Sequence, residues 1–216
     1  MARLDRTYCD ICGSVLPPMG YVKIKDGNIC GDCSRKISPF IKNKREASTD
    51  FLRRHIKYRE ENQKRLRDFK PAISFGYDKK IYIDPYMSGF VVTGKKEEDI
   101  VDDNPDIIML SQVKSCDTDI KEITKEEFDI DENGKKVSFF PPHIKYYYDF
   151  KTEIVVESEW FDRIVVDLNG ESVSGRGSIR YQKCAGIAKQ LKDTLLLDNH
   201  KKRNGFTRQD NNLFTL

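Results

Sequence analysis

The strongest pattern along the chain is an alternation of apolar and polar residues from Ile144 to Val156. Successive side chains of a β-strand point to opposite faces, so this alternation predicts one long strand. Its apolar face is expected to carry Ile144, Tyr146, Tyr148, Phe150, Thr152, Ile154 and Val156. We therefore expect Tyr146, Tyr148 and Phe150 to pack in a core, while Tyr147 points outward.

Other segments predict the rest of a β domain. Short strands are expected at 81–83, 89–94, 107–113 and 161–168, and an acidic strand within 114–136 turns at Asn133-Gly134. A helix over 178–197 has one apolar stripe, formed by Tyr181, Cys184, Ala188, Leu191 and Leu195. Antiparallel strands closed by one helix are typical of a pleckstrin-homology-like β-barrel or a related β-sandwich. The predicted class is α+β, with this domain at 71–197 and a flexible tail at 198–216.

The first 36 residues follow a different pattern, built around two Cys-x-x-Cys pairs. Cys9 and Cys12 are followed by Gly13, which suits the tight turn of a zinc knuckle. Residues 21–25 then alternate, and Asp26-Gly27 is a strong hairpin turn. The second pair, Cys30 and Cys33, opens a short helix. Knuckle, hairpin and helix in this order predict a treble-clef zinc finger at 1–36.

These four cysteines are the most specific chemical signal in the sequence. Zinc prefers four tetrahedral soft ligands, and the seventeen residues between the pairs lie in the usual range for such sites. We expect Cys9, Cys12, Cys30 and Cys33 to bind one structural Zn²⁺ ion and to leave no open position for catalysis. The alternative is four free or disulfide-bonded cysteines, which the absence of a signal peptide disfavours.

A basic segment at 37–70 links the two parts. A helix is expected to begin near Ser48 or Thr49 and to end before Pro71. Its middle is polar all round, which is typical of a bridge between domains. Residues 35–70 hold thirteen Lys/Arg and five Asp/Glu, whereas residues 94–136 hold seven Lys and fourteen Asp/Glu.

This charge distribution leaves two interpretations of the helix open. It could contact nucleic acid or, more weakly, an anionic membrane surface, through Arg53, Arg54, Lys57, Arg59, Lys64 and Arg65. It could equally be a solvated helix stabilised by pairs such as Glu60–Lys64. Aromatic residues suited to base stacking are sparse in this segment.

Nothing in the sequence predicts an enzyme. No phosphate-binding loop, dinucleotide fingerprint, nucleophile elbow or histidine metal motif occurs. Of the two remaining cysteines, Cys184 lies on the apolar helix stripe and Cys116 could be exposed. Charged residues make up 34% of the chain and no apolar run is long enough to span a membrane, so we expect a cytoplasmic protein.

The sequence resembles a bacterial family of uncharacterised proteins with an N-terminal four-cysteine zinc module. The similarity rests on the cysteine spacing, a segment at 54–62, the Phe69-Lys-Pro71 exit, and stretches at 134–142, 146–150 and 160–169. The resemblance implies a pleckstrin-homology-like C-terminal domain and no established activity.

The function that the sequence favours is therefore a non-catalytic binding or adaptor protein. Its β domain would offer a surface or an exposed strand edge to a protein partner, and no small-molecule substrate is expected. Nucleic-acid binding and anionic-membrane binding are the alternatives.

Overall fold

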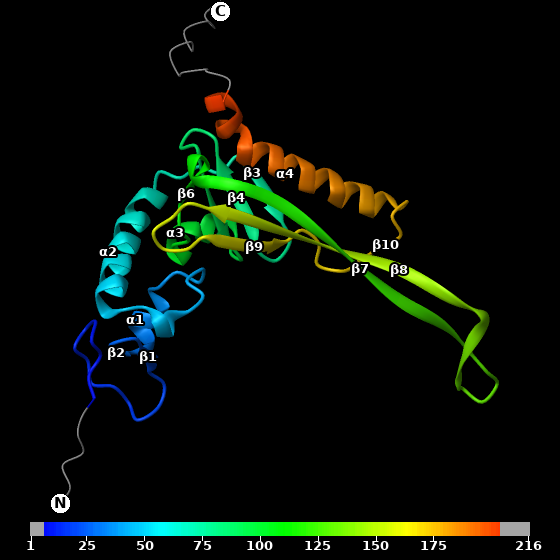
Figure 1. The fold of residues 1–216 in the computed structure, drawn as a ribbon, viewed down its shortest axis with the longest axis horizontal. Coiled ribbons are helices and arrows are strands. Elements are labelled where there is room, and N and C mark those ends of the chain that lie inside the picture. The colour runs from blue at the N-terminus through cyan, green and yellow to red at the C-terminus, as the bar shows by residue number, and fades with distance from the viewer. Residues whose placement is uncertain (1–6, 204–216) are drawn as a thin grey trace, which may run out of the picture.

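The computed structural model describes residues 7–203, and the side chains of residues 7–196. The chain forms a small N-terminal head, one long helix, two antiparallel sheets and a C-terminal helix (Figure 1). The head and the long helix lie at one end of the molecule, and a two-stranded ribbon projects from the other end. Part of the tail predicted at 198–216 continues the last helix as far as Arg203, and the remainder lies outside the described residues.

The head contains the expected hairpin and helix. Strands β1 (Val22–Ile24) and β2 (Gly27–Ile29) pair antiparallel, and α1 (Gly31–Arg35) follows directly. A 3-10 turn, η1 (Lys44–Glu46), precedes the long helix α2 (Thr49–Leu66). The side chain of Ser48 accepts a hydrogen bond from the Phe51 amide, so Ser48 is the N-cap of α2, one of the two residues predicted.

The first sheet has the order β3-β4-β5-β6. Its strands are β3 (Ile73–Gly76), β4 (Lys80–Asp84), β5 (Gly89–Thr93) and β6 (Ile108–Met109). Between β5 and β6 lie η2 (Glu97–Asp99) and α3 (Ile100–Asp103). The single strand predicted at 107–113 is wrong, because the chain turns after two residues into η3 (Leu110–Gln112), where the Gln112 side chain accepts a hydrogen bond from the Met109 amide.

The second sheet is built on two very long strands. Strands β7 (Val113–Ile130) and β8 (Lys136–Val156) form a hairpin that turns at 131–134, as the sequence predicts. Strand β9 (Arg163–Asp167) and the short β10 (Val173–Ser174) both pair with β8, which leaves β7 at the edge of the sheet. Helix α4 (Ile179–Arg203) follows.

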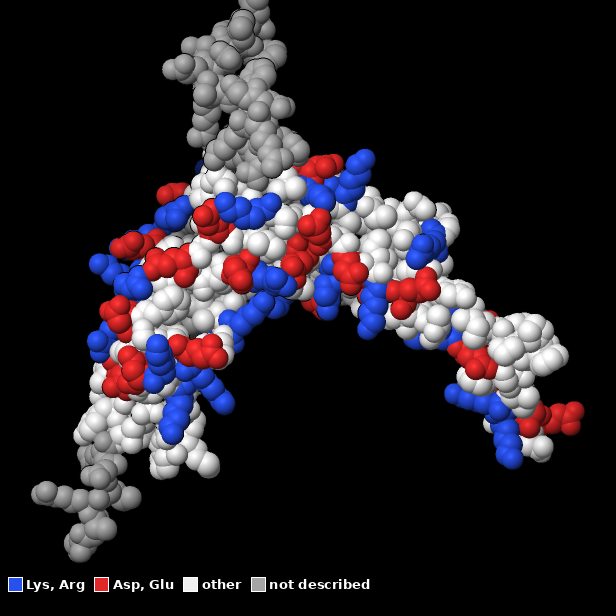
Figure 2. Space-filling view, in the orientation of Figure 1, with Lys and Arg blue, Asp and Glu red and all other residues white. Residues whose placement is uncertain are grey.

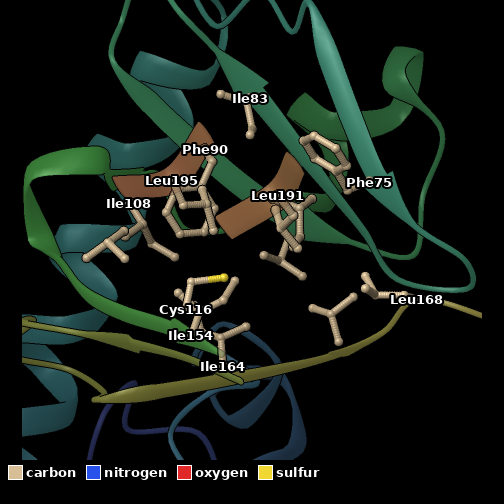
Figure 3. Packing of buried hydrophobic residues seen from close by; sticks show 14 of the residues in the cluster. Phe75, Ile83, Phe90, Ile108, Cys116, Ile154, Ile164, Leu168, Leu191 and Leu195 are labelled. Atoms are coloured by element: carbon tan, nitrogen blue, oxygen red, sulfur yellow. The ribbon is translucent and has the colours of Figure 1, made fainter. Parts of the chain in front are cut away.

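The main core lies between the two sheets. Phe75, Ile83, Phe90 and Ile108 of the first sheet face Cys116, Ile154, Ile164 and Leu168, with Leu191 and Leu195 of α4 between them (Figure 3). The two sheets do not join into a closed barrel within residues 7–203, so the pleckstrin-homology-like barrel is not confirmed. What the structure supports is a mixed α+β fold with antiparallel sheets.

The burial of several cysteines and tyrosines tests the pattern of apolar positions. Cys116, for which the sequence left exposure possible, is fully buried in the core, whereas Cys184 packs against the core as its helical position indicates. Tyr148 and Phe150 are buried as expected, but Tyr146 is 47% exposed and Ile144 is also exposed. The alternation identified the strand correctly, but this part of β8 extends beyond the layers that would cover it.

No helix in the described part of the chain is both long and apolar enough to cross a bilayer.

Candidate metal centre

The four predicted ligands meet in the head. The sulfur atoms of Cys9, Cys12, Cys30 and Cys33 all lie within 4.8 Å of one another, and Cys12 Sγ lies 3.7 Å from Cys30 Sγ. A tetrahedral zinc site with bonds of about 2.3 Å places its sulfurs roughly 3.8 Å apart. The cluster therefore fits a four-thiolate metal ion such as zinc, and it is the one such group among the side chains of residues 7–196.

Backbone amides point at these sulfurs. The Cys30 amide donates to Cys9 Sγ at 3.3 Å, and the Cys33 amide donates to Cys30 Sγ at 3.4 Å. Donors of this kind stabilise the thiolate form, which is the form that binds metal. The local backbone thus stabilises the negatively charged form of Cys9 and Cys30.

The surroundings lower the pKa of two of the thiols, which favours the thiolate, but raise the pKa of a third. Contacts with the Ser14 side chain and amide lower the pKa of Cys12 to about 6. Burial works against ionisation of Cys9, but hydrogen bonds from the amides of Cys12, Cys30 and Ile11 outweigh it and lower its pKa. Burial, together with the neighbouring thiols, raises the pKa of Cys33. Four thiolates this close repel one another, so a cation is needed to hold all of them in the charged state.

The first cysteine pair is held against the hairpin. The Asp10 carboxylate accepts a hydrogen bond from the Asn28 amide at 2.7 Å, and the Asp10 amide donates to the Asn28 carbonyl. A Cβ atom at Gly27 would lie 2.3 Å from the Asp10 carboxylate, so this close approach requires glycine. Gly13 has φ +74°, the left-handed conformation predicted for the knuckle.

Helix α2 attaches the metal centre to the rest of the protein. The Asp26 carboxylate in the hairpin turn accepts hydrogen bonds from the amide and hydroxyl of Thr49, at the start of α2. Leu52 and Ile56 complete the core of the head. The first half of α2 is therefore part of the head, although the sequence suggested a separate linker.

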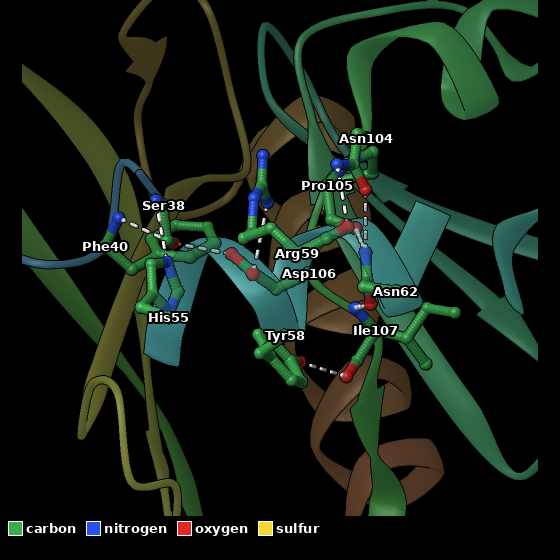
Figure 4. Close-up of polar contacts among 10 residues, drawn as sticks. All are labelled: Ser38, Phe40, His55, Tyr58, Arg59, Asn62, Asn104, Pro105, Asp106 and Ile107. Carbon is green, nitrogen blue, oxygen red and sulfur yellow. Dashed lines mark hydrogen bonds and ion pairs between the residues drawn. The ribbon is translucent and has the colours of Figure 1, made fainter. Parts of the chain in front are cut away.

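The middle of α2 carries a buried polar cluster that was not predicted from the sequence (Figure 4). Ser38 donates from its amide to His55 Nε2 at 3.0 Å and from its hydroxyl to Asp106 at 2.5 Å. Asp106 also forms an ion pair with Arg59 at 3.1 Å. Asn62 donates to the Pro105 carbonyl and accepts from the Ile107 amide. These contacts join the head, α2 and the loop before β6.

Periodicity was the available signal for this cluster. Residues 52, 55, 56, 59, 62 and 66 are buried at helical spacing, although three of them are polar. The middle of the helix, residues 59–65, is polar all round in sequence, yet Arg59 and Asn62 within it are buried. Because Trp160 packs against the rings of His55 and Tyr58, the buried face of α2 also contacts the segment before β9.

The basic residues predicted to contact phosphate do not form one surface. Arg59 is only 7% exposed, Arg53 donates to the Asp10 carbonyl, and Arg54 pairs with Asp50 and Glu159. Lys57, Lys64 and Arg65 are exposed. Figure 2 shows acidic and basic side chains interspersed over this end of the molecule. Nucleic-acid binding by α2 stays a prediction.

Comparison with known proteins covers the head. Residues 7–55 match a family model described as a domain of unknown function, DUF4428. This match and the cysteine cluster fit an N-terminal zinc module, and the matched segment ends within α2. No curated protein and no solved structure matches the chain.

Proposed function

We propose that the chain is a non-catalytic, zinc-containing binding protein that recognises a protein partner through its β7–β8 ribbon. The head is proposed to be a treble-clef finger holding one structural Zn²⁺ ion, because all four ligand positions are filled by thiolates. The observation that carries the binding function is the outer part of the ribbon, residues 119–147, which we call the arm.

The arm offers open strand edges. Its strands pair only with each other from Thr124↔Tyr146 to Ile130↔Lys136. Strand β10 reaches β8 only at Tyr147 and Tyr148, and β9 only from Lys151 onward. An isolated two-stranded ribbon is marginally stable in water, and an unpaired edge is a template for a further strand. A partner that adds a strand would stabilise the ribbon and pair with its open edge.

The arm also exposes apolar side chains on one face. Ile144 and Tyr146 lie opposite Glu126 and Thr124, and Phe128 and Ile130 continue the same face of β7. This is the face on which Tyr148 and Phe150 contact Tyr181 of α4 nearer the core. The apolar face of the core thus continues past the start of α4, where nothing in the described chain covers it. Phe140, in the bulge between the two registers of β8, is fully exposed.

Charge indicates the chemistry of the partner. Residues 117–132 of the outgoing strand and turn hold eight Asp/Glu and two Lys, whereas residues 135–147 of the returning strand hold three Lys and no acid. The edge of β7 is unpaired along the whole strand, whereas β8 has β9 and β10 on its other side nearer the core. A segment that pairs with β7 meets acidic side chains. We infer an extended partner segment that alternates apolar and basic residues.

The test is selection from a display library of ten-residue peptides, using the zinc-loaded full chain. Peptides with alternating basic and apolar residues should be enriched. Phe128→Ser and Phe140→Ser should each weaken their binding about tenfold, as expected for the loss of one buried aromatic contact. The matched control is Tyr86→Ser, which removes from the β4–β5 turn an aromatic ring that is exposed to nearly the same extent as Phe140.

Methylation of alternate peptide nitrogens should abolish binding if the peptide pairs as a strand, because it removes the ladder donors. Selected peptides that bind equally well to the Phe128 and Phe140 variants would refute the arm as the site. Concentration-dependent dimerisation that is lost in Phe128→Ser would instead assign the arm to a second copy of the chain and overturn the proposed partner.

A further inference from the structure

A second concave site lies at the junction of the head, α2 and the first sheet. It is a pocket of about 340 Å³. Its walls come from the end of α1 and the loop after it, from Arg59 of α2, from Val92 of β5, and from the loop at 103–106. Small-molecule sites occur preferentially at such junctions and have volumes of this order. The arm proposed to bind protein lies at the opposite end of the molecule (Figure 1).

Arg59 is the unusual residue of this pocket. Its side chain is only 8% exposed, and one end of the guanidinium lies 3.1 Å from Asp106 Oδ1. The atom in this ion pair is Nη1, but its contact with Asp106 Oδ1 lacks hydrogen-bond geometry, so Nη1 and Oδ1 are both buried without a hydrogen bond in the described chain. Arg59 Nε is also buried and has no acceptor there. A buried charged donor that lacks an acceptor costs free energy, and an arginine has five donors in a planar fork. An acceptor supplied from outside would satisfy this group.

A second cation faces the same pocket. Lys44 is half-buried, and its Nζ donates to the Ser34 carbonyl at 3.1 Å. No carboxylate within residues 7–196 lies in ion-pair range of Lys44. Burial and the nearby positive charge of Arg59 both lower the pKa of Lys44. Both cations line the same pocket, so an anion between them would reduce their mutual repulsion.

The other charges of the pocket do not cancel this excess. Asp106 is already shared between Arg59 and the Ser38 hydroxyl, and the Asp103 carboxylate is engaged by the Thr93 hydroxyl. Arg35 also lines the pocket but pairs with Asp32. The cations without a full complement of acceptors are thus Arg59 and Lys44, within the part of the chain that the structure describes.

We propose that this pocket binds the oxyanion group of a small molecule, a phosphate or a carboxylate, between Arg59 and Lys44. Arginine matches the geometry of both groups with two parallel hydrogen bonds, and lysine adds a point charge. Pro39, Phe40 and Val92 give the pocket an apolar wall for the remainder of the ligand. Ser34 and Arg35 belong to α1, the helix that carries Cys33. The ligand would therefore contact the head directly.

The experiment is calorimetric titration of the zinc-loaded full chain with inorganic phosphate and, separately, with citrate, at constant ionic strength. Binding of either anion is expected. Lys44→Gln should weaken it about tenfold, the effect of losing one charge-assisted hydrogen bond. Arg59→Lys, which keeps the charge beside Asp106 but loses the fork, should weaken it by a similar factor. Lys64→Gln, an exposed cation on the same helix, should bind like the wild type.

The two anions distinguish the sources of the oxyanion. Tighter binding of phosphate would indicate a phosphorylated ligand, and tighter binding of citrate a carboxylate ligand; both support the site. Since Arg59→Lys could fail to fold, circular dichroism is recorded first and Lys44→Gln then carries the test. Absence of binding by both anions at millimolar concentration, or equal weakening by Lys44→Gln and Lys64→Gln, would overturn the proposal.

Discussion

The Ser38 hydroxyl donates a hydrogen bond of 2.5 Å to the carboxylate of Asp106, a residue 68 positions further along the chain. Both side chains are completely buried. Ser38 follows α1 of the head, and Asp106 precedes β6, the last strand of the first sheet. This single contact therefore joins the two parts that the sequence presents as separate modules.

Removal of this contact should loosen the junction. In Ser38→Ala the Asp106 carboxylate loses a donor and stays buried, which should lower the free energy of unfolding by about 1–3 kcal/mol. Chemical denaturation followed by circular dichroism measures the change. Ser174→Ala, at an exposed position of β10, is the control and should stay within about 0.5 kcal/mol of the wild type. An equal effect of both substitutions would contradict the role of the Ser38–Asp106 bond.

His55 should make stability depend on pH. Its Nε2 accepts a hydrogen bond from the Ser38 amide, which requires the neutral ring. Burial lowers the pKa of His55 from 6.5 to about 4, although the charge of Asp106 partly opposes this shift. Between these values the unfolded chain binds more protons, so stability is full above pH 6.5 and is lost as pH falls toward 4. The loss should be on the order of 3 kcal/mol.

The measurement for His55 is denaturant unfolding at pH 7, 6, 5 and 4, compared with His55→Gln. The glutamine carbonyl can replace Nε2 as acceptor but does not titrate in this range. Carboxylates contribute equally to both proteins, so the difference between the two curves isolates His55. Identical pH dependence of the two proteins would show that His55 does not control the transition.

Metal removal should unfold the head selectively. The core of the head is small, and structural zinc is typically worth roughly 10–16 kcal/mol in modules of this kind. We expect about one zinc per chain, and chelation should remove hydrogen-exchange protection from residues 22–35 while β4, β5 and β9 stay protected, because their core lies between the sheets. Cys30→Ser should reproduce the chelated state. A stoichiometry near zero in a protein with a protected head would refute the metal site.

Two glycines should respond in opposite directions to alanine. At Gly27 the added Cβ would lie 2.3 Å from the Asp10 carboxylate, so Gly27→Ala should separate the first cysteine pair from the hairpin and weaken metal retention against a chelator.

At Gly186, on the exposed face of α4, nothing lies within 4 Å of the new Cβ. Gly186→Ala should therefore stabilise the protein by about 0.5–1 kcal/mol in thermal or denaturant unfolding.

Local patterns predicted the local structure well. The spacing of the cysteines, the Asp26-Gly27 turn and the alternation in β8 each depend on residues close together in the sequence, and the structure has the cysteine cluster, the hairpin and the long strand where they were expected. The 107–113 segment shows the limit of this approach. Its apolar run is compatible with a strand, but a hydrogen bond from the Met109 amide to the Gln112 side chain closes a turn there.

The sequence by itself determined the four clustered cysteines, most of the strands and the amphipathic C-terminal helix, because each is encoded by periodicity or spacing within a short segment. Only the tertiary structure decided that His55, Arg59 and Asn62 belong to the buried face of α2, since their partners lie outside the helix, 17 positions away for His55 and about 45 for Arg59 and Asn62. It also decided that the arm is uncovered. Alternation defines the two faces of a strand, but whether another layer covers a face depends on distant parts of the chain.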